Sequence, residues 1–210
     1  MILGISTSPR ANGISANAIQ YMLSKFDEET KYISLANKKI NGCISCLGCA
    51  KTNRCVIKDD FSEIQDLMVK ADKIILGVPN YYDLPNALAH CLLERCFCFR
   101  HNNAFVLKDK PIVIFSTGYS SDITNNQVLK TIKIFLNSNK MKIVDSFLVG
   151  AFSQCYTCPI GISCSIGNVV KDHGYLEKIT ADVLPLEFNE QNESIEKCNK
   201  AVLLLKNALN

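Results

Sequence analysis

The stretch KIILGVP, residues 73–79, is a continuous apolar run that ends at a proline. Two other short runs have the same character, MILGIS at 1–6 and PIVIFST at 111–117. Strands without polar alternation are typical of parallel sheets that are covered on both faces, because neither face meets water. These three runs therefore predict strands of a buried parallel sheet.

Helical patterns separate these strands from one another and from two further strands, TKYISL at 30–35 and KIVDSFLVGA at 142–151. Apolar residues recur at helical spacing over 13–26. Further helices are expected at 59–71, 84–97, 126–139 and about 190–208. Alternation of strands and helices predicts an α/β fold, a three-layer doubly wound domain around a parallel five-stranded sheet with right-handed crossovers.

The composition is that of an ordinary globular chain, with 210 residues, 48% hydrophobic and 20% charged. The net charge of +3 is too small to indicate a nucleic acid or a membrane surface as partner. No apolar run approaches the roughly 18 to 20 residues that span a bilayer. The start, MILGISTSPR, lacks the features of a signal peptide. We expect a cytoplasmic single domain over 1–210, with a Cys-rich insertion at 41–58 and an irregular Cys-rich stretch at 152–185.

The loop after the first strand, STSPRANGISAN at 6–17, combines hydroxyl side chains, Arg10 and two asparagines before a helix. Free backbone N–H groups and the dipole at a helix N-terminus suit a phosphate, and an arginine adds a charged fork. The loop matches neither the GxGxxG fingerprint nor a Walker loop. The alternative is an ordinary strand-to-helix turn with a serine cap.

Two further loops follow the third and fourth strands of the predicted sheet. GVPNYYDLP at 77–85 places two tyrosines after a proline, and STGYSS at 116–121 carries hydroxyls, a glycine and Tyr119. Ligands of such sheets bind at the carboxyl ends of the strands. A phosphate site beside two loops that suit a flat heterocycle indicates a mononucleotide cofactor. The alternative is that the tyrosines only pack the rim.

Eleven cysteines are a high count for a chain without an export signal, so clustered thiols favour metal ligation over disulfides. The densest group is GCISCLGCAKTNRC at 42–55, with Cys43, Cys46, Cys49 and Cys55. The Cys-x2-Cys-x2-Cys spacing is that of bacterial ferredoxins, whereas zinc sites usually pair two ligands, leave a longer gap and pair two more. The pattern favours a [4Fe–4S] cluster, with zinc and free thiols as alternatives.

A second group, CYTCPIGISC at 155–164, holds Cys155, Cys158 and Cys164, with His173 following. These residues are a candidate second metal site, and the alternative is a buried thiol-rich loop. The scattered cysteines, Cys91, Cys96, Cys98 and Cys198, are expected to be small buried hydrophobic residues.

The loop motifs together resemble a known family. Ser-Pro-Arg-x-Asn-Gly-x-Ser at 8–15, Pro-x-Tyr at 79–81 and Thr-Gly at 117–118 are similar to those of the flavodoxin-like NAD(P)H-dependent FMN reductases. The segment CISCLGCAKTNRCVIKDDF at 43–61 resembles the iron–sulfur flavoprotein branch, which carries a compact four-cysteine motif after the second strand. The resemblance covers residues 1 to about 150.

The resemblance implies FMN as cofactor and a role for each matching position. It implies that the FMN phosphate is held by Ser8, Arg10, Ser15 and Asn17. It places the isoalloxazine beside Pro79, Asn80, Tyr81 and Tyr82, with Thr117 and Gly118 at the other edge. In this family the flavin is the reaction centre, so no catalytic side chain is expected.

The predicted function is that of an oxidoreductase, a redox flavoprotein passing electrons between a [4Fe–4S] cluster and FMN. NAD(P)H or ferredoxin is the expected donor, and the resemblance implies a homodimer or homotetramer. One alternative is a plain NAD(P)H-dependent FMN or quinone reductase whose thiol loop binds zinc or stays free. Another is a non-catalytic electron carrier.

Overall fold

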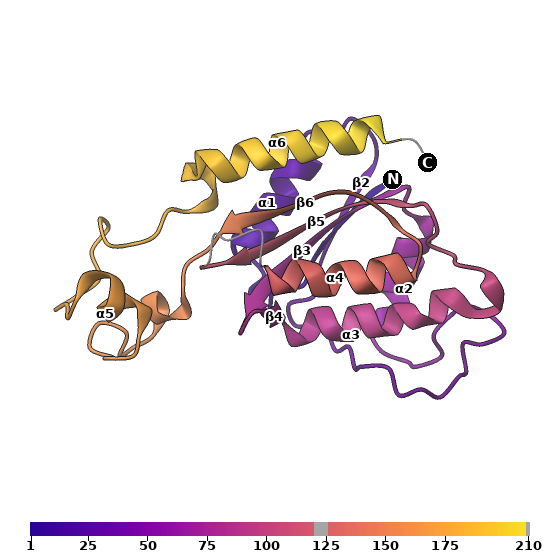
Figure 1. The fold of residues 1–210 in the computed structure, drawn as a ribbon, viewed down its shortest axis with the longest axis horizontal. Coiled ribbons are helices and arrows are strands. Elements are labelled where there is room, and N and C mark those ends of the chain that lie inside the picture. Colours follow the sequence, from indigo (N-terminus) through magenta and orange to yellow (C-terminus); the bar gives the residue numbers. More distant parts are fainter. Residues whose placement is uncertain (120–125, 209–210) are drawn as a thin grey trace.

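A parallel β-sheet forms the centre of the molecule in the computed structural model, which describes residues 1–119 and 126–208. The parallel strands are β1 (Ile2–Ser6), β2 (Thr30–Ser34), β3 (Lys73–Tyr81), β5 (Pro111–Gly118) and β6 (Lys142–Gly150), in the order β2-β1-β3-β5-β6 (Figure 1). This is the flavodoxin-like doubly wound order. The predicted α/β fold with five parallel strands is therefore confirmed.

A sixth strand, β4 (Leu84–Pro85), was not predicted. It pairs antiparallel with the end of β3, so that Tyr81 faces Leu84. Both residues of the connecting turn, Tyr82 (φ 53°) and Asp83 (φ 59°), are left-handed, as a two-residue hairpin requires. The predicted helix at 84–97 therefore begins later, as α3 (Ala87–Arg95), and continues into the 3₁₀ segment η1 (Cys96–Asn103).

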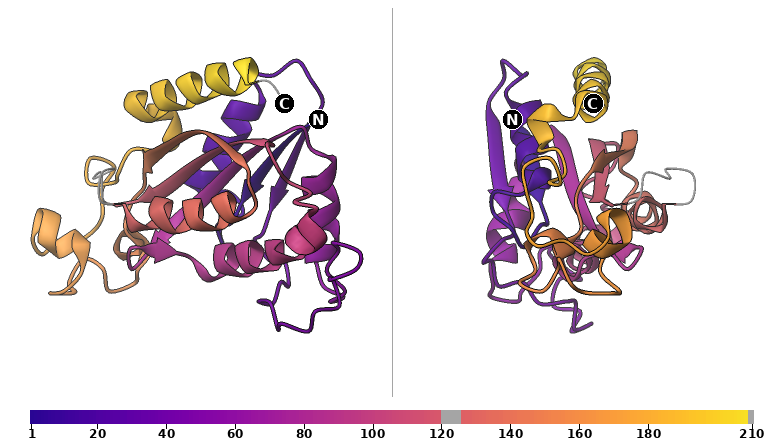
Figure 2. Two further views of the ribbon diagram at one scale, coloured as in Figure 1. Left: turned by 45° about the vertical axis from the view of Figure 1, so that its right-hand side comes forward. Right: turned by 90° about the vertical axis from the view of Figure 1, so that its left-hand side faces the viewer.

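The helices cover both faces of the sheet (Figures 1 and 2). One face carries α1 (Ile14–Leu23) and α6 (Asn192–Asn207), and the other carries α2 (Phe61–Lys70), α3 and α4 (Gln127–Ser138). Adjacent strand residues serve opposite cores because side chains alternate across a strand. Ile74 packs with α2, α3 and α4, whereas Ile75 packs with α1 and α6. Both faces are thus buried, as the unbroken apolar runs required.

Gly4 in β1 lets helix α1 approach the sheet closely. A Cβ atom at this position would lie 2.3 Å from Ile19 Cγ2 and 2.9 Å from Leu23 Cδ1. Any larger side chain would push α1 outward. The close contact sets the distance between β1 and the middle and end of α1.

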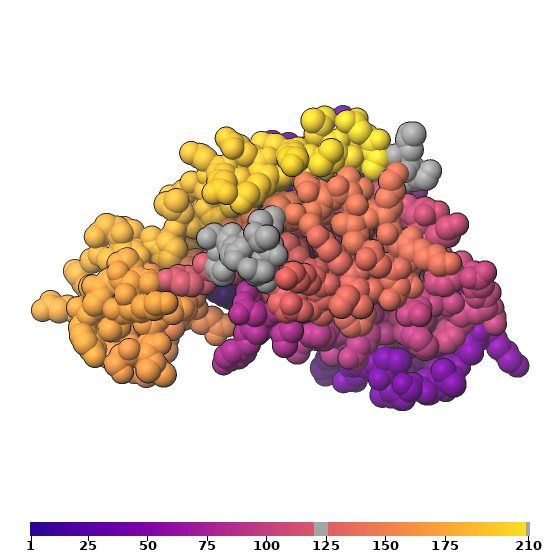
Figure 3. Space-filling model, in the orientation of Figure 1, coloured from indigo at the N-terminus to yellow at the C-terminus, as the bar shows by residue number. Residues whose placement is uncertain are grey.

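Two segments lie outside this layered body. The first is the thiol loop, residues 41–58, which contains no helix or strand and lies at the lower right in Figures 1 and 3. The second is the C-terminal lobe, residues 152–191, which projects beyond the end of β6 and contains η2 (Gln154–Thr157), α5 (Asn168–His173) and η3 (Phe188–Glu190). Across the described residues, every helix is too short or too polar to traverse a lipid bilayer.

Candidate functional site

A cavity of about 730 Å³ opens at the carboxyl ends of the central strands. Its walls come from four places: the loop between β1 and α1, the end of β3 with the β3–β4 hairpin, the end of β5, and the C-terminal lobe. In a doubly wound sheet this is where the chain connections diverge and leave a crevice. The volume is in the range that binds a cofactor-sized organic molecule.

The β1–α1 loop forms an anion-binding end of this cavity. Helix α1 begins at Ile14 after Gly13, which offers no side-chain cap, so the N–H groups of Ile14 and Ser15 stay available at the cavity wall, whereas that of Ala16 donates to the Gly13 carbonyl. Ser8 is buried, and its hydroxyl accepts from the backbone N–H of Arg10 at 3.1 Å. Arg10 is exposed, with its guanidinium 5.7 Å from the ring centre of Phe152. These groups suit a phosphate.

Asn86 holds the same loop against the sheet, and the sequence analysis did not identify it. Its side chain is buried, accepts from the Thr7 hydroxyl at 3.0 Å and donates to the Thr7 carbonyl at 2.7 Å. Asn86 also precedes α3, so it ties this helix to the β1–α1 loop. No local sequence pattern marks such a contact, because the partners are 79 positions apart.

Ser15 and Thr117 join α1 to β5 inside the cavity. Their hydroxyl oxygens are 2.8 Å apart, and both side chains are buried. Neighbouring Gly118 leaves room for Asn80, whose Cβ would be 2.9 Å from a Cβ at that position. The small residues at the end of β5 therefore let three strand ends converge around the same space.

The β3–β4 hairpin forms the opposite rim. Asn80 closes the hairpin by accepting from the Asp83 N–H at 2.8 Å. Tyr82 sits at the tip with its side chain fully exposed, while Tyr81 accepts a hydrogen bond from Gln154 of the C-terminal lobe at 3.2 Å. Tyr81 and Tyr82 thus occupy different environments although they are adjacent in sequence.

The C-terminal lobe is attached to the end of β5 by a cluster of polar side chains. The Tyr119 hydroxyl donates to Asp172 at 2.5 Å, and this hydrogen bond raises the pKa of Tyr119 to about 12. Tyr156 donates to the same carboxylate at 3.2 Å, and its hydroxyl is 2.8 Å from His173 Nε2. The lobe therefore closes one side of the cavity.

The structure brings the residues proposed for the flavin together, with one exception. Those that line the cavity are Ser8, Arg10, Ser15, Pro79, Asn80, Tyr81, Tyr82, Thr117 and Gly118. Asn17 is exposed on α1 and is not among the cavity-lining residues of the described chain. Ser120 and Ser121, which belong to the predicted third loop, fall outside the described residues.

A second, much smaller hollow of about 20 Å³ lies under the thiol loop. Its walls include Cys43, Cys46, Cys49 and Cys55 together with Cys98 and Arg95. Cys43 and Cys46 are exposed, whereas Cys49 is buried and its sulfur is 3.1 Å from His101 Nε2. Burial and the neighbouring thiols raise the pKa of Cys49. The four cysteines of the motif therefore border one hollow, two of them with exposed side chains, and a fifth thiol from η1 borders it as well.

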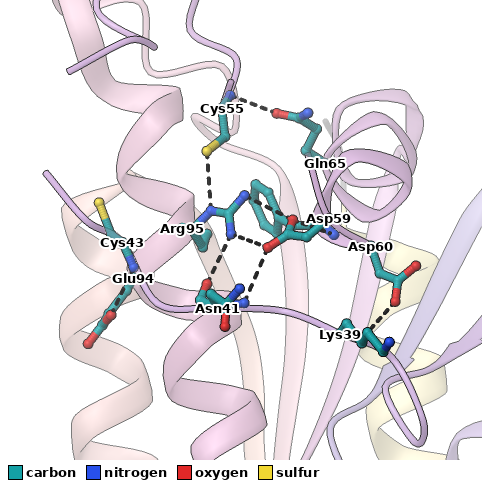
Figure 4. A network of polar contacts seen from close by, with 10 residues as sticks. Lys39, Asn41, Cys43, Cys55, Asp59, Asp60, Gln65, Glu94 and Arg95 are labelled. Carbon is teal, nitrogen blue, oxygen red and sulfur yellow. Dashed lines mark hydrogen bonds and ion pairs between the residues drawn. The ribbon is translucent and has the colours of Figure 1, made fainter. Parts of the chain in front are cut away.

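Arg95 connects the two ends of the thiol loop (Figure 4). Its Nε donates to Cys55 Sγ at 3.2 Å, and its terminal nitrogens donate to the Asn41 carbonyl at 2.9 Å and to both oxygens of Asp59 at 2.7 and 3.1 Å. The Arg95 side chain is 0% exposed and that of Asp59 is 7% exposed. No local sequence pattern marked this role, because Arg95 follows Glu94 at the end of an amphipathic helix.

Further contacts fix the backbone at both ends of the motif. The Cys43 N–H donates to Glu94 at 3.2 Å, and the Cys55 N–H donates to the buried Gln65 at 2.9 Å (Figure 4). Between them, Ser45 (φ 53°) and Leu47 (φ 57°) take left-handed conformations on either side of Cys46 and curl the chain. The loop is therefore anchored at its ends and strongly curved between them.

The four thiols around the hollow are the ligands that an iron–sulfur cluster requires. Their sulfur atoms do not converge on one point in this conformation of the loop. Four thiols, an N–H donor to one sulfur and an imidazole beside another are the usual surroundings of a thiolate-ligated metal group. In the described part of the chain, no three His, Cys, Asp or Glu side chains converge closely enough to hold a metal ion. Ligation would require the exposed Cys43 and Cys46 to turn inward.

The second cysteine group is also dispersed. Cys158 is exposed, Cys155 and Cys164 are half-buried, and His173 bonds to Tyr156. Hydrogen bonds from Ser153 and from the backbone of Asn168 lower the pKa of Cys155. Of the scattered cysteines, Cys96, Cys98 and Cys198 are buried as expected, and Cys91 is half-buried.

Comparison with known proteins gives a consistent family assignment. The family model described as NADPH-dependent FMN reductase matches residues 1–154. An iron–sulfur flavoprotein of Methanocaldococcus jannaschii is 32% identical over 154 residues, which are 71% of this chain and 77% of that protein. A second iron–sulfur flavoprotein of the same organism is 34% identical over 146 residues, 68% of this chain and 75% of that protein.

Among solved structures, the apo form of an NADH:FMN oxidoreductase is similar in fold. The alignment covers 100% of this chain and 89% of that one, with a TM-score of 0.60 and 16% identity. At this identity the likeness extends to the fold alone.

Proposed function

The chain belongs to the iron–sulfur flavoprotein branch of the NADPH-dependent FMN reductase family, and on this premise we propose that its sheet-edge cavity is the FMN site. It is an FMN-dependent oxidoreductase. The observation that carries the proposal is the cavity of about 730 Å³ with an uncapped helix N-terminus at one end and the hairpin tyrosines at the other.

The phosphate end of the proposed site is the first turn of α1. The N–H groups of this turn, the Ser8 and Ser15 hydroxyls and the guanidinium of Arg10 would hold the phosphate dianion. Asn17 is exposed in the first turns of α1 and is not among the lining residues, and it remains a proposed phosphate contact through its side chain. Asn86 positions the loop without reaching the ligand.

The ring end of the proposed site lies between β3 and β5. Pro79, Asn80 and Tyr81 would flank one edge of the isoalloxazine, and Thr117 and Gly118 the other. Tyr82 lines the opening but projects from the hairpin tip. We therefore assign Tyr82 to the entrance, where it would meet an incoming substrate. The C-terminal lobe limits the access of water on the remaining side.

We further propose that Cys43, Cys46, Cys49 and Cys55 bind a [4Fe–4S] cluster. The common hollow, the hydrogen bond from Arg95 to Cys55 and the names of the related proteins support this assignment. When bound, FMN supplies one- or two-electron chemistry and the cluster supplies single electrons. Within the chain, the thiol loop would hold the cluster and the sheet edge would hold the flavin.

The proposal includes an oligomer and an external donor. The thiol loop and the C-terminal lobe lie toward opposite ends of the long axis in Figure 1, and the left-hand view of Figure 2 agrees. An assembly of two or four copies would let the thiol loop of one subunit approach the cavity of another. We propose NAD(P)H or a ferredoxin as the donor, and residues 1–210 as one functional domain.

Anaerobic purification followed by FMN, iron and zinc analysis tests the proposal. We expect one FMN and about four irons per chain, with broad absorbance in the visible region. The double variant Cys46→Ala/Cys49→Ala should lose iron and keep FMN, while Cys91→Ala/Cys198→Ala, which removes two thiols outside the hollow, should keep both.

The outcomes separate the rival functions. Zinc or no metal in the wild-type protein would contradict the cluster and favour a plain FMN reductase. Both cofactors without NAD(P)H oxidation would favour an electron carrier reduced by ferredoxin. Iron that survives in Cys46→Ala/Cys49→Ala would contradict the assignment of the ligands.

A further inference from the structure

Arg95 is the most deeply buried charge in the described chain that contacts a residue of the thiol loop. Its side chain is 0% exposed, and every nitrogen of the guanidinium has an acceptor: Cys55 Sγ, the Asn41 carbonyl and the Asp59 carboxylate. The ring of Phe61 lies 4.6 Å from the guanidinium carbon. A buried arginine with every guanidinium nitrogen hydrogen-bonded in a planar fork is rigidly held, so its position relative to the sulfur is fixed.

The same contacts close the thiol loop into a ring. Asn41 precedes the first cysteine of the motif and Asp59 follows the last, and the Asn41 N–H also donates to Asp59 at 3.2 Å. Arg95 therefore binds both ends of the loop and one of its sulfurs at once (Figure 4). Movement of Cys55 away from the hollow would break its hydrogen bond with Arg95 Nε, while the terminal nitrogens of Arg95 would stay bonded to Asp59.

The charge of Arg95 acts directly on the sulfur. An N–H donor and a positive charge at a ligand sulfur stabilise the reduced form of a cluster, which carries one more negative charge. In a buried site this interaction is weakly screened. Arg54 offers a natural comparison, since it adjoins Cys55 in sequence but pairs with Asp66 at the surface, with side-chain exposures of 52% and 56%. Solvent and salt screen such an exposed pair.

We infer that Arg95 is the positioning residue of the thiol loop, which holds Cys55 at the hollow and raises the reduction potential of the cluster bound there. The inference rests on the proposed cluster and deepens it. It assigns to one buried guanidinium two effects on the same ligand, a geometric one and an electrostatic one.

The test compares two double variants, each of which replaces an Arg–Asp ion pair by neutral side chains. The reduction of the cluster is titrated and monitored by electron paramagnetic resonance. Arg95→Gln/Asp59→Asn removes the buried charges together, so that neither partner is left as an unpaired buried ion. Arg54→Gln/Asp66→Asn makes the same chemical change at the surface beside the same cysteine. We expect the buried pair to shift the reduction equilibrium of the cluster about tenfold toward the oxidised form, which is about 59 mV for one electron. The surface pair should shift it less than about threefold.

Iron and FMN content and circular dichroism accompany the titration. A folded, flavin-bound Arg95→Gln/Asp59→Asn protein that keeps its iron at the wild-type potential would overturn the inference. Loss of iron from that folded protein, with iron retained in the surface pair, would support the positioning role. A wild-type protein without iron would overturn the cluster proposal and the inference with it, so the two failures are distinguishable.

If Arg95→Gln/Asp59→Asn does not fold, the single variant Arg95→Lys provides the test. It retains a cation for Asp59 but cannot keep the whole fork and the contact to Cys55. We expect its reduction equilibrium to lie between the wild type and the neutral pair, or its iron to be partly lost. Wild-type iron content together with a wild-type potential in Arg95→Lys would contradict the role of the N–H···S contact.

Discussion

At the scale of single residues, the contact between Ser15 and Thr117 joins two parts of the proposed FMN site. Ser15 stands in the first turn of α1 and Thr117 near the end of β5, and their hydroxyls are 2.8 Å apart in a buried environment. One hydroxyl must donate and the other accept. Each side chain therefore fixes the direction in which its partner can offer a hydrogen bond to a ligand.

Thr117→Val should weaken both this contact and flavin binding. Valine keeps the shape of threonine but leaves the Ser15 hydroxyl without its partner, which costs about 1 to 3 kcal/mol at a buried site. The effect should appear as a lower urea midpoint and a larger FMN dissociation constant in fluorescence titration.

A double-mutant cycle gives the control. Ser15→Ala combined with Thr117→Val should cost less than the sum of the single changes, by about 0.5 to 1.5 kcal/mol, because both remove the same bond. Additive effects would show that the two hydroxyls do not interact.

Sequence reasoning identified the site residues that belong to short local motifs. The motifs at 8–15, 79–82 and 117–118 end neighbouring parallel strands, so the topology alone brings them to one cavity. Asn86 and Arg95 were missed because their partners, Thr7 and Asp59, are far away along the chain. Cys98 was predicted to be a buried hydrophobic residue, and it is buried, but it also lines the thiol hollow.

At the scale of elements, two helices that both follow sheet strands begin in different ways. Helix α1 starts without a side-chain cap at the cavity, whereas Asn126 caps α4 by accepting from the Leu129 N–H at 3.0 Å. A cap satisfies one of the free N–H groups that would otherwise be available to a ligand. One N–H group of the first turn of α4 is thus satisfied within the chain, whereas no side chain occupies those of α1.

Asn126→Ala should therefore destabilise the protein without affecting the flavin site. Loss of an asparagine cap costs about 1 kcal/mol, within a range of about 0.5 to 2. Urea denaturation should reveal the loss, and Gln127→Ala at the exposed next position should change stability by less than about 0.5 kcal/mol. Equal effects of the two changes would argue against a capping role.

Element types followed from the sequence, and some of their boundaries did not. Continuous apolar runs and helical periodicity predicted the five parallel strands and the main helices. The helix expected from residue 84 was wrong at its start, because Tyr82 and Asp83 adopt left-handed conformations and form a hairpin there. Non-glycine residues rarely adopt this conformation, so their sequence gave no signal for the turn.

At the scale of the whole molecule, the C-terminal lobe forms part of the cavity wall. Phe152, Ser153, Gln154, Asn168 and Glu187 all line the cavity. A ligand that fills this space would therefore bind the sheet edge and the lobe together and reduce the opening of the lobe.

Limited trypsin digestion should detect this coupling. Lys178 is exposed in the lobe, and we expect FMN to slow cleavage there several-fold because it lowers the population of open lobe. Cleavage at Lys108, an exposed site outside the lobe, serves as the control and should not change. Equal cleavage of the lobe with and without FMN would indicate that the ligand does not reach it.

The position of Arg95 in the chain has a consequence for biosynthesis. Its contact to Cys55 spans 40 residues, and a ribosome adds about 5 to 20 residues per second. The four thiols of the loop therefore leave the ribosome seconds before the guanidinium that binds Cys55, just as β1 is synthesised before β3, with which it pairs. During that interval Cys55 lacks the N–H donor of Arg95, so the closed form of the thiol loop can arise only after residue 95 has left the ribosome.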